Sequence, residues 1–168
     1  MEFNEVIKKR SATRKFSDKK VPREIIDQIL EAGNLAPTAK NQQPQFIYVV
    51  ESYEGLSKID MVSPCRYNAQ CCLIVCGNKD LAFTKNNHST LEVDVSIVAT
   101  HMILSAANLG VDSTWIAMFD EEKTKEIFEL DNNLEPVCII NLGYKTEDCP
   151  LNINHNIRKD INSLVKFI

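Results

Sequence analysis

Apolar residues recur with helical spacing in the first part of the chain. Near the amino terminus, Phe3, Val6 and Ile7 predict a short amphipathic helix. A longer helix is predicted between Pro22, which suits a first helical turn, and Pro37, which ends the pattern. Its apolar positions are Ile25, Ile26, Ile29, Leu30 and Gly33. Both segments are therefore expected to turn one apolar face toward a core.

A third apolar segment, from Leu91 to Leu109, predicts a central helix. It is apolar around nearly the whole helical circumference, so we expect other parts of the protein to cover it on all sides. Gly110 suits the C-cap position at its end. Weaker patterns predict three shorter helices, at Ser52–Met61, from Asp120 to about Glu129, and near Asp160–Phe167.

Four short apolar runs predict strands, and predicted helices lie between them. These runs are Phe46–Val50, Leu73–Cys76, Trp115–Phe119 and Val137–Leu142. The run Leu73–Cys76 is apolar on both faces, which is typical of an interior strand. Residues 77–89, which follow it, are expected to form a polar loop. This order indicates a mixed organisation of helices and strands, and it leaves the strand order and direction open.

The composition is that of one globular domain spanning residues 1–168. The chain is 44% hydrophobic and 25% charged, with 5 glycines and 6 prolines, which excludes the disordered and fibrous classes. Its net charge of −4 argues against a duplex-DNA clamp or a basic membrane anchor. This length leaves little room for both a complete core and a large enclosed cavity, so a ligand site shared with a partner subunit is one expectation.

Several features predict a cytoplasmic protein without a membrane or nucleic-acid partner. The first ten residues, MEFNEVIKKR, lack the apolar centre of a secretory signal. Acidic and polar residues interrupt the apolar segment 91–109, which argues against a membrane span. The six cysteines contain no C-x-x-C pair, so we expect reduced, mostly buried thiols and no metal site.

Positive charge is concentrated in residues 8–23. This segment holds eight basic residues and one acid, which gives a local charge of +7 in an acidic protein. Ser11, Thr13 and Ser17 lie among these bases, and arginines with small hydroxyls can hold a phosphate group. The alternative is a solvated basic face, which charge alone favours. Neither G-x-G-x-x-G nor G-x-x-x-x-G-K-[ST] is present, so the usual Rossmann and P-loop signatures are missing.

Three motifs in register resemble those of the FMN-dependent nitroreductase family. Residues 9–16, KRSATRKF, resemble its R-x-S-x-R-x-F signature, and residues 36–44, APTAKNQQP, resemble its A-P-S-x-x-N-x-Q-P segment. Residues 115–120, WIAMFD, resemble its W-[IV]-G-x-F-[DN] strand end. The central helix and the ending from Leu142-Gly143-Tyr144 to Arg158-Lys159 are similar to the short members of the family, so the resemblance covers essentially the whole chain.

The resemblance implies an α+β sandwich, in which helices flank a small mixed sheet. It also implies an intertwined homodimer with FMN at the subunit interface, in which residues 145–168 form an exchanged carboxyl-terminal arm with a short helix. An apolar central helix in so short a chain is compatible with this assembly, because a second subunit can cover it. Burial of that helix within a monomer is the alternative that the pattern leaves open.

The resemblance assigns the amino-terminal signature and the tail to FMN. Arg10 would bind the phosphate or ribityl region, with Ser11 and Ala12 beside it, and Arg158 would close on the same phosphate. Arg14 would lie at the N1 and O2 edge of the flavin, where a fixed cation favours two-electron reduction. Ala12 replaces the serine that the family usually has, so one hydroxyl is missing unless Ser11 or Thr13 replaces it.

Two further segments would contact the flavin ring by the same resemblance. Pro37, Thr38 and Ala39 would touch the flavin that the other subunit mainly holds, and Asn41 would either contribute or cap the turn before Pro44. Backbone groups of three residues would face the ring, with an amide donor near N5: Ile116, Ala117 and Met118. Ala117 stands where the family usually has glycine. Arg66 and Asn68 are additional candidates for the flavin edge.

The implied activity is an FMN-dependent oxidoreductase that uses NADH or NADPH. Hydride would pass through flavin N5 to a nitroaromatic, quinone or similar conjugated acceptor by a ping-pong mechanism. No side chain is assigned as an indispensable acid or base. One alternative is an enzyme of the same fold with a specialised substrate such as an enone. Another is a non-enzymatic or slowly turning-over FMN-binding, redox-responsive dimer, suggested by Ala12, Ala117 and the cysteines.

Overall fold

The centre of the molecule is a four-stranded antiparallel sheet. The computed structural model describes residues 2–150 and 152–168. The strands are β1 (Gln45–Val50), β2 (Cys71–Asn78), β6 (Leu134–Gly143) and β5 (Asp112–Ile116), in the order β1-β2-β6-β5. The predicted α+β class is confirmed. The sheet was predicted to be mixed, but every neighbouring pair of its strands is antiparallel. A parallel contact occurs outside the named strands, as an isolated bridge between Ala12 and Ser113.

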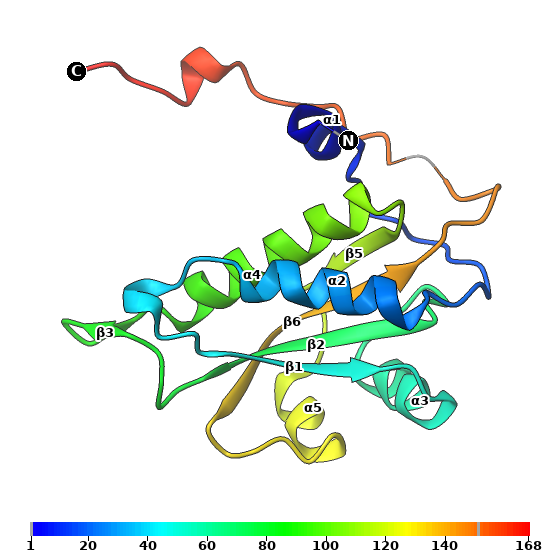
Figure 1. The fold of residues 1–168 in the computed structure, drawn as a ribbon, viewed down its shortest axis with the longest axis horizontal. Coiled ribbons are helices and arrows are strands. Elements are labelled where there is room, and N and C mark those ends of the chain that lie inside the picture. Colours follow the sequence, from blue (N-terminus) through cyan, green and yellow to red (C-terminus); the bar gives the residue numbers. More distant parts are fainter. Residues whose placement is uncertain (1, 151) are drawn as a thin grey trace.

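Helices cover both faces of this sheet, as Figure 1 shows. One face packs against α2 (Arg23–Asn34) and α4 (Leu91–Asn108), and the other against α3 (Tyr53–Val62) and α5 (Glu121–Ile127). Side chains alternate along β2, so that Leu73 and Val75 lie in the first core and Ile74 in the second. This arrangement explains why the predicted interior strand is apolar on both faces.

The central helix α4 forms as predicted, but one of its faces is open in the single chain. Its inner face packs closely on α2, where a Cβ on Gly33 would lie 2.8 Å from Cγ of Met102. Gly110, at φ +78°, ends the helix in the left-handed conformation that glycine adopts without strain. On the outer face Val93 is 54% exposed. One chain therefore does not bury α4 completely, so the alternative of burial within a monomer is wrong, and coverage by a second subunit stays a prediction.

The structure differs from the predictions in the segment after β2 and at the end of β5. Residues 77–89 contain the end of β2 and a small hairpin of β3 (Thr84–Lys85) and β4 (His88–Ser89) rather than a loop. Asn86 and Asn87 at its turn both have positive φ, which tight hairpin turns require and asparagine tolerates. The strand β5 ends at Ile116, so residues 117–119 lie in a loop.

The carboxyl-terminal arm is extended, as expected, and runs past the short helix α1 (Phe3–Lys9) (Figure 1). Its predicted helix is reduced to one turn of 3₁₀ helix, η2 (Ile161–Ser163). The apolar side chains of this region are exposed, Phe167 to 94%, and a short helix without packing is marginal in water. No helix in the described ranges is long and apolar enough to cross a membrane.

Candidate functional site

The segment that follows α1 runs along the edge of the sheet beside β5. The backbone N–H of Thr13 donates to the carbonyl oxygen of Ser113 at 3.0 Å, and the hydroxyl of Thr114 donates to the carbonyl oxygen of Thr13. Thr13 is buried, whereas Arg14 is exposed. This extra strand-like contact fixes the backbone of the amino-terminal signature and leaves its arginines outside the core.

Arg10 and Arg158 form a cationic pair at the base of the arm. Burial lowers the pKa of Arg10 below its ordinary value, and the positive charge of Arg158 lowers that pKa further. Within residues 2–150 and 152–168, no carboxylate lies within 4.0 Å of either guanidinium. The ring nitrogen Nε2 of His155 lies 2.7 Å from the carbonyl oxygen of Lys8 and joins the arm to α1. An anion is the complement that such a pair lacks.

A cavity of about 310 Å³ lies between the same signature and the start of the arm. Ser11, Ala12 and Thr13 form one wall. The other wall consists of Lys145, Thr146, Glu147, Cys149, Pro150 and Asn152. Ser11 also lines a second cavity of about 30 Å³ with Arg10. Small hydroxyls and the cationic side chain of Lys145 thus line a cavity beside Arg10.

The loop that carries Pro37, Thr38, Ala39 and Asn41 lies elsewhere in the subunit. It follows α2, whereas the residues of the amino-terminal signature precede that helix of 12 residues, which is roughly 18 Å long at 1.5 Å per residue. Figure 1 shows this loop at the opposite end of α2 from the signature. The loop contains the 3₁₀ turn η1 (Ala39–Asn41). One chain therefore does not bring these four residues to Arg10 and Arg158.

The residues predicted to face the flavin ring lie just after β5. Ile116 is buried, and Ala117 and Met118 are exposed in the following loop. The hydroxyl of Ser63 donates to the carbonyl oxygen of Met118 at 2.7 Å, and the N–H of Asp120 donates to the carbonyl oxygen of Val62 at 2.9 Å. These bonds tie this loop to the end of α3.

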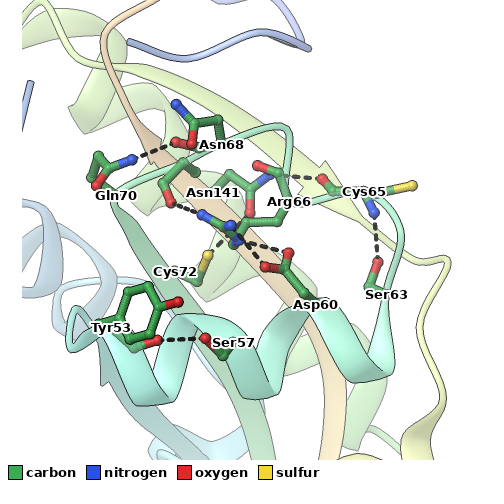
Figure 2. A network of polar contacts seen from close by, with 11 residues as sticks. Tyr53, Ser57, Asp60, Ser63, Cys65, Arg66, Asn68, Gln70, Cys72 and Asn141 are labelled. Atoms are coloured by element: carbon green, nitrogen blue, oxygen red, sulfur yellow. Dashed lines mark hydrogen bonds and ion pairs between the residues drawn. The ribbon is translucent and has the colours of Figure 1, made fainter. Parts of the chain in front are cut away.

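The loop between α3 and β2 has structural hydrogen bonds that the sequence did not reveal (Figure 2). The Arg66 guanidinium bonds both carboxylate oxygens of Asp60 at 2.7 Å, and it also donates to the carbonyl oxygen of Ala69. The amide of Asn68 donates to the carbonyl oxygen of Phe16 at 3.2 Å and to Asp18 at 3.0 Å. Arg66 and Asn68 are thus engaged by the protein itself: Arg66 ties the loop to α3, and Asn68 holds it against the amino-terminal signature.

Arg14 lies near the hydroxyl of Tyr67, which comes from the same loop. The pKa of Tyr67 is raised, mainly by its hydrogen bond to Cys65 and by burial, while Arg14 acts in the opposite direction. Asp60, Ser63 and Asn141 were missed by the sequence reasoning. For Asn141, the available signal was a single polar residue within an apolar strand.

A groove of about 970 Å³ lies on the open face of α4. Phe3 and Val6 of α1 and Ala32 of α2 border it. The residues of α4 that line it are Glu92, Val93, Ser96, Ile97, Thr100, His101, Leu104, Ser105 and Asn108. A largely apolar groove of this size on a helix face is typical of a protein–protein contact.

Comparison with known proteins gives one consistent result. The sequence model of the nitroreductase family matches residues 7–66 and 64–144. The chain is 32% identical over 155 residues to a Methanothermobacter thermautotrophicus protein whose name provisionally describes an NADH dehydrogenase/NAD(P)H nitroreductase, covering 88% of this chain and 80% of that one. The described signatures and the family match therefore lie in the same part of the chain.

Solved structures agree with the sequence comparison. A nitroreductase family protein of Clostridium difficile superposes with a TM-score of 0.93 at 34% identity, over 99% of this chain and 98% of that one. A Staphylococcus epidermidis protein, described provisionally as an NAD(P)H:FMN oxidoreductase, superposes with a TM-score of 0.87 at 24% identity, over 99% and 96% of the two chains. At that identity the second comparison concerns the fold alone.

Proposed function

The chain belongs to the nitroreductase family, and from this premise we propose that it is an FMN-dependent oxidoreductase. It takes electrons from NADH or NADPH and delivers them to a nitroaromatic, quinone or similar conjugated acceptor. Nicotinamide and acceptor use the same cleft in turn, in a ping-pong sequence. The observation that carries the proposal is the pairing of Arg10 with Arg158. Among the described residues, no carboxylate lies within 4.0 Å of either guanidinium.

The residues present fit the phosphate end of FMN. Two neighbouring guanidinium groups are stabilised by a dianion, because each can donate parallel hydrogen bonds to phosphate oxygens. Ser11 and Thr13 line the adjoining cavity of about 310 Å³ with Lys145 and can bond the ribityl chain. Ala12 contributes only a methyl group to this wall.

FMN held by these residues would supply two-electron redox chemistry between NAD(P)H and the acceptor. The chain's own residues bind and orient. Arg14 provides a fixed positive charge for the N1 and O2 edge, and Ile116, Ala117 and Met118 provide the backbone beside the ring. The Ser63–Met118 hydrogen bond holds that backbone in place. Solvent supplies the protons, so no side chain is assigned as acid or base.

A homodimer completes the proposed site. Pro37, Thr38, Ala39 and Asn41 lie far from the cationic pair of their own chain, so a second subunit has to bring them to the flavin. The apolar groove on α4 offers an interface for it. The arm offers exposed apolar side chains that suit exchange between subunits: Ile153, Ile157, Ile161, Leu164, Val165 and Phe167.

The buried thiols favour the reductase over a redox-responsive binding protein. The cysteines are free, and Cys71, Cys72 and Cys76 are buried. Burial raises the pKa of each of these three thiols, to about 12 for Cys72 and for Cys76, so they stay protonated and unreactive at neutral pH. An enzyme of the same fold with a specialised substrate such as an enone shares every feature named here.

An absorption experiment tests the proposal. The purified protein is reconstituted with FMN, desalted, and then mixed anaerobically with NADH or NADPH. Retained flavin bands that bleach on addition of either nucleotide are the expected result. Retained bands that do not bleach would favour a binding protein or another reductant, and the loss of flavin on desalting would contradict FMN as the cofactor.

A further inference from the structure

Asp94 is a buried acid in the first turn of α4. It is 2% exposed, and within residues 2–150 and 152–168 no Lys or Arg nitrogen lies within 4.0 Å of its carboxylate. Oδ1 accepts a hydrogen bond from the backbone N–H of Ala39 at 2.8 Å, and Oδ2 accepts one from the hydroxyl of Thr90 at 2.8 Å. The positive end of the helix adds a favourable potential. A buried carboxylate is costly, so its hydrogen-bond partners identify what it holds in place.

Its first partner belongs to a strained loop. Lys40, Asn41 and Gln43 have φ values of 53°, 56° and 49°, in the left-handed region that non-glycine residues rarely adopt. The backbone N–H of Gln43 donates to the hydroxyl of Thr38 at 3.0 Å. Such a conformation persists only where surrounding contacts impose it, and strained loops of this kind gather at functional sites.

Its second partner belongs to the hairpin segment before α4. The backbone N–H of Thr90 donates to the carbonyl oxygen of Phe83 at 2.9 Å. The ammonium group of Lys40 lies 4.2 Å from the centre of the Phe83 ring, so the strained loop and the hairpin segment also touch directly. Asp94 is the side chain whose two oxygens join both segments to one helix.

The same helical turn also borders the apolar groove. Val93, the residue before Asp94, lines that groove and is 54% exposed. Val93 and Asp94 therefore lie on opposite sides of α4. Val93 lines the face available to a second copy, and Asp94 holds the loop of Thr38 and Ala39.

We propose that Asp94 is a positioning residue that fixes the backbone of Thr38 and Ala39 for contact with the flavin of the partner subunit, and that it links this loop rigidly to the interface helix. The inference rests on the proposed function, because it assigns the loop to FMN. Asp94 itself touches no reacting atom in this assignment. Its effect is to present a loop in a conformation that the loop alone does not favour.

Hydrogen exchange and FMN affinity test the proposal in three full-length variants. Asp94→Ala removes both acceptors, Asp94→Asn keeps one carbonyl oxygen for the N–H of Ala39, and Asp27→Asn makes the same charge change on the exposed surface of α2. Exchange of the Ala39 amide in the FMN-free protein is expected to rise about tenfold or more in Asp94→Ala, since the hydrogen bond that protects this amide is lost. Amides of β2 and β6 should keep their protection.

The FMN dissociation constant is expected to rise by about tenfold in Asp94→Ala and to return most of the way in Asp94→Asn, as a hydrogen-bonding role requires. If Asp94→Ala does not fold, Thr90→Val takes its place and should loosen residues 83–90 and 38–43. Unchanged exchange at Ala39, or an FMN affinity that falls equally in Asp27→Asn, would overturn the inference. Absence of FMN binding by the wild-type protein would instead refute the proposed function, while the exchange of Ala39 still decides whether Asp94 holds the loop.

Discussion

Asn141 donates a hydrogen bond from its side-chain amide to the carbonyl oxygen of Cys65 at 2.9 Å, from the middle of the core strand β6 (Figure 2). The same nitrogen also donates to the carbonyl oxygen of Arg66 at 2.9 Å, and its oxygen accepts from the thiol of Cys72. Asn141 is fully buried. A polar side chain in this position is stable because each of its groups has a partner.

We predict that Asn141→Ala destabilises the protein strongly. Two buried carbonyl oxygens lose their donor, and we expect the free energy of unfolding to fall by about 2–4 kcal/mol. The melting temperature should fall by roughly 2–4 °C for each kcal/mol in a protein of this size. Urea unfolding at fixed protein concentration measures the loss. Asn133→Ala, which removes a bond to the exposed Asp80, is the control and should change stability by less than about 0.5 kcal/mol.

The buried thiols predict a loss of stability at alkaline pH. Burial raises the pKa of Cys72 and of Cys76 from 9.0 to about 12 in the folded protein. The folded state therefore holds protons that the unfolded state releases above pH 9, so the stabilisation is complete below pH 9 and is lost as pH rises toward 12. Each thiol contributes a slope of up to about 1.4 kcal/mol per pH unit. Urea unfolding between pH 8 and pH 11 measures this decline.

Cys76→Ala provides the comparison for that slope. The variant is less stable at every pH because it leaves a small cavity, but its stability should fall less steeply above pH 9. If the free energy of unfolding falls with pH equally steeply in wild type and variant, ionisation of Cys76 does not contribute to the alkaline loss of stability. Cys149→Ala, at a half-buried position in the arm, should leave the wild-type slope in place.

The elements with a regular pattern could be predicted from the sequence. The helix α2 and the strand β2 follow from the 3.6-residue and continuous apolar patterns, because burial against neighbours selects those residues. The hairpin at Thr84–Ser89 was missed because two-residue strands leave no periodic signal. The sequence left open what covers the outer face of α4, since an apolar surface looks the same whether its own chain or a second copy covers it.

The residues of the candidate site also fall into those that the sequence suggested and those whose role only the structure shows. Arg10 and Arg158 were found through motifs, and the structure brings them together across most of the chain length. The roles of Asp94 and Asn141 depend on partners distant in sequence, so no local pattern could assign them. Arg66 was a candidate for the flavin edge because of its charge, yet only the structure shows that Asp60 already holds it.

The cationic pair predicts a difference between FMN and riboflavin, which lacks the phosphate. Wild-type protein should bind FMN more tightly than riboflavin by about 10–100-fold, since charged hydrogen bonds contribute about 1.5–3 kcal/mol. Arg10→Ala and Arg158→Ala should reduce this ratio toward one, mainly by weakening FMN. Isothermal titration at two salt concentrations measures both ligands. Lys20→Ala, within the same basic segment, should keep the ratio, and equal losses for both ligands in Arg10→Ala would place Arg10 away from the phosphate.

Arg14 predicts a change in redox potential rather than in phosphate recognition. Its charge near the N1 edge should favour the reduced cofactor, so Arg14→Ala should lower the midpoint potential of bound FMN while Arg14→Lys keeps much of it. Spectroelectrochemical titration measures the potential, and the ratio of FMN to riboflavin affinity should stay unchanged. A potential equal to that of the wild type, with FMN fully bound, would rule out the proposed position of Arg14.

Ala12 provides a test of whether a neighbouring hydroxyl replaces the serine that the family usually carries. Ser11 and Ala12 line the same cavity of about 310 Å³, and the isolated bridge to Ser113 fixes the backbone there. Ala12→Ser should tighten FMN binding by up to about tenfold, the effect of one hydrogen bond of about 0.5–1.5 kcal/mol. If Ser11 already supplies that bond, Ser11→Ala weakens binding in the wild type and much less in the Ala12→Ser background. The four dissociation constants form a double-mutant cycle, and strictly additive effects would show that the two hydroxyls bind different parts of the ligand.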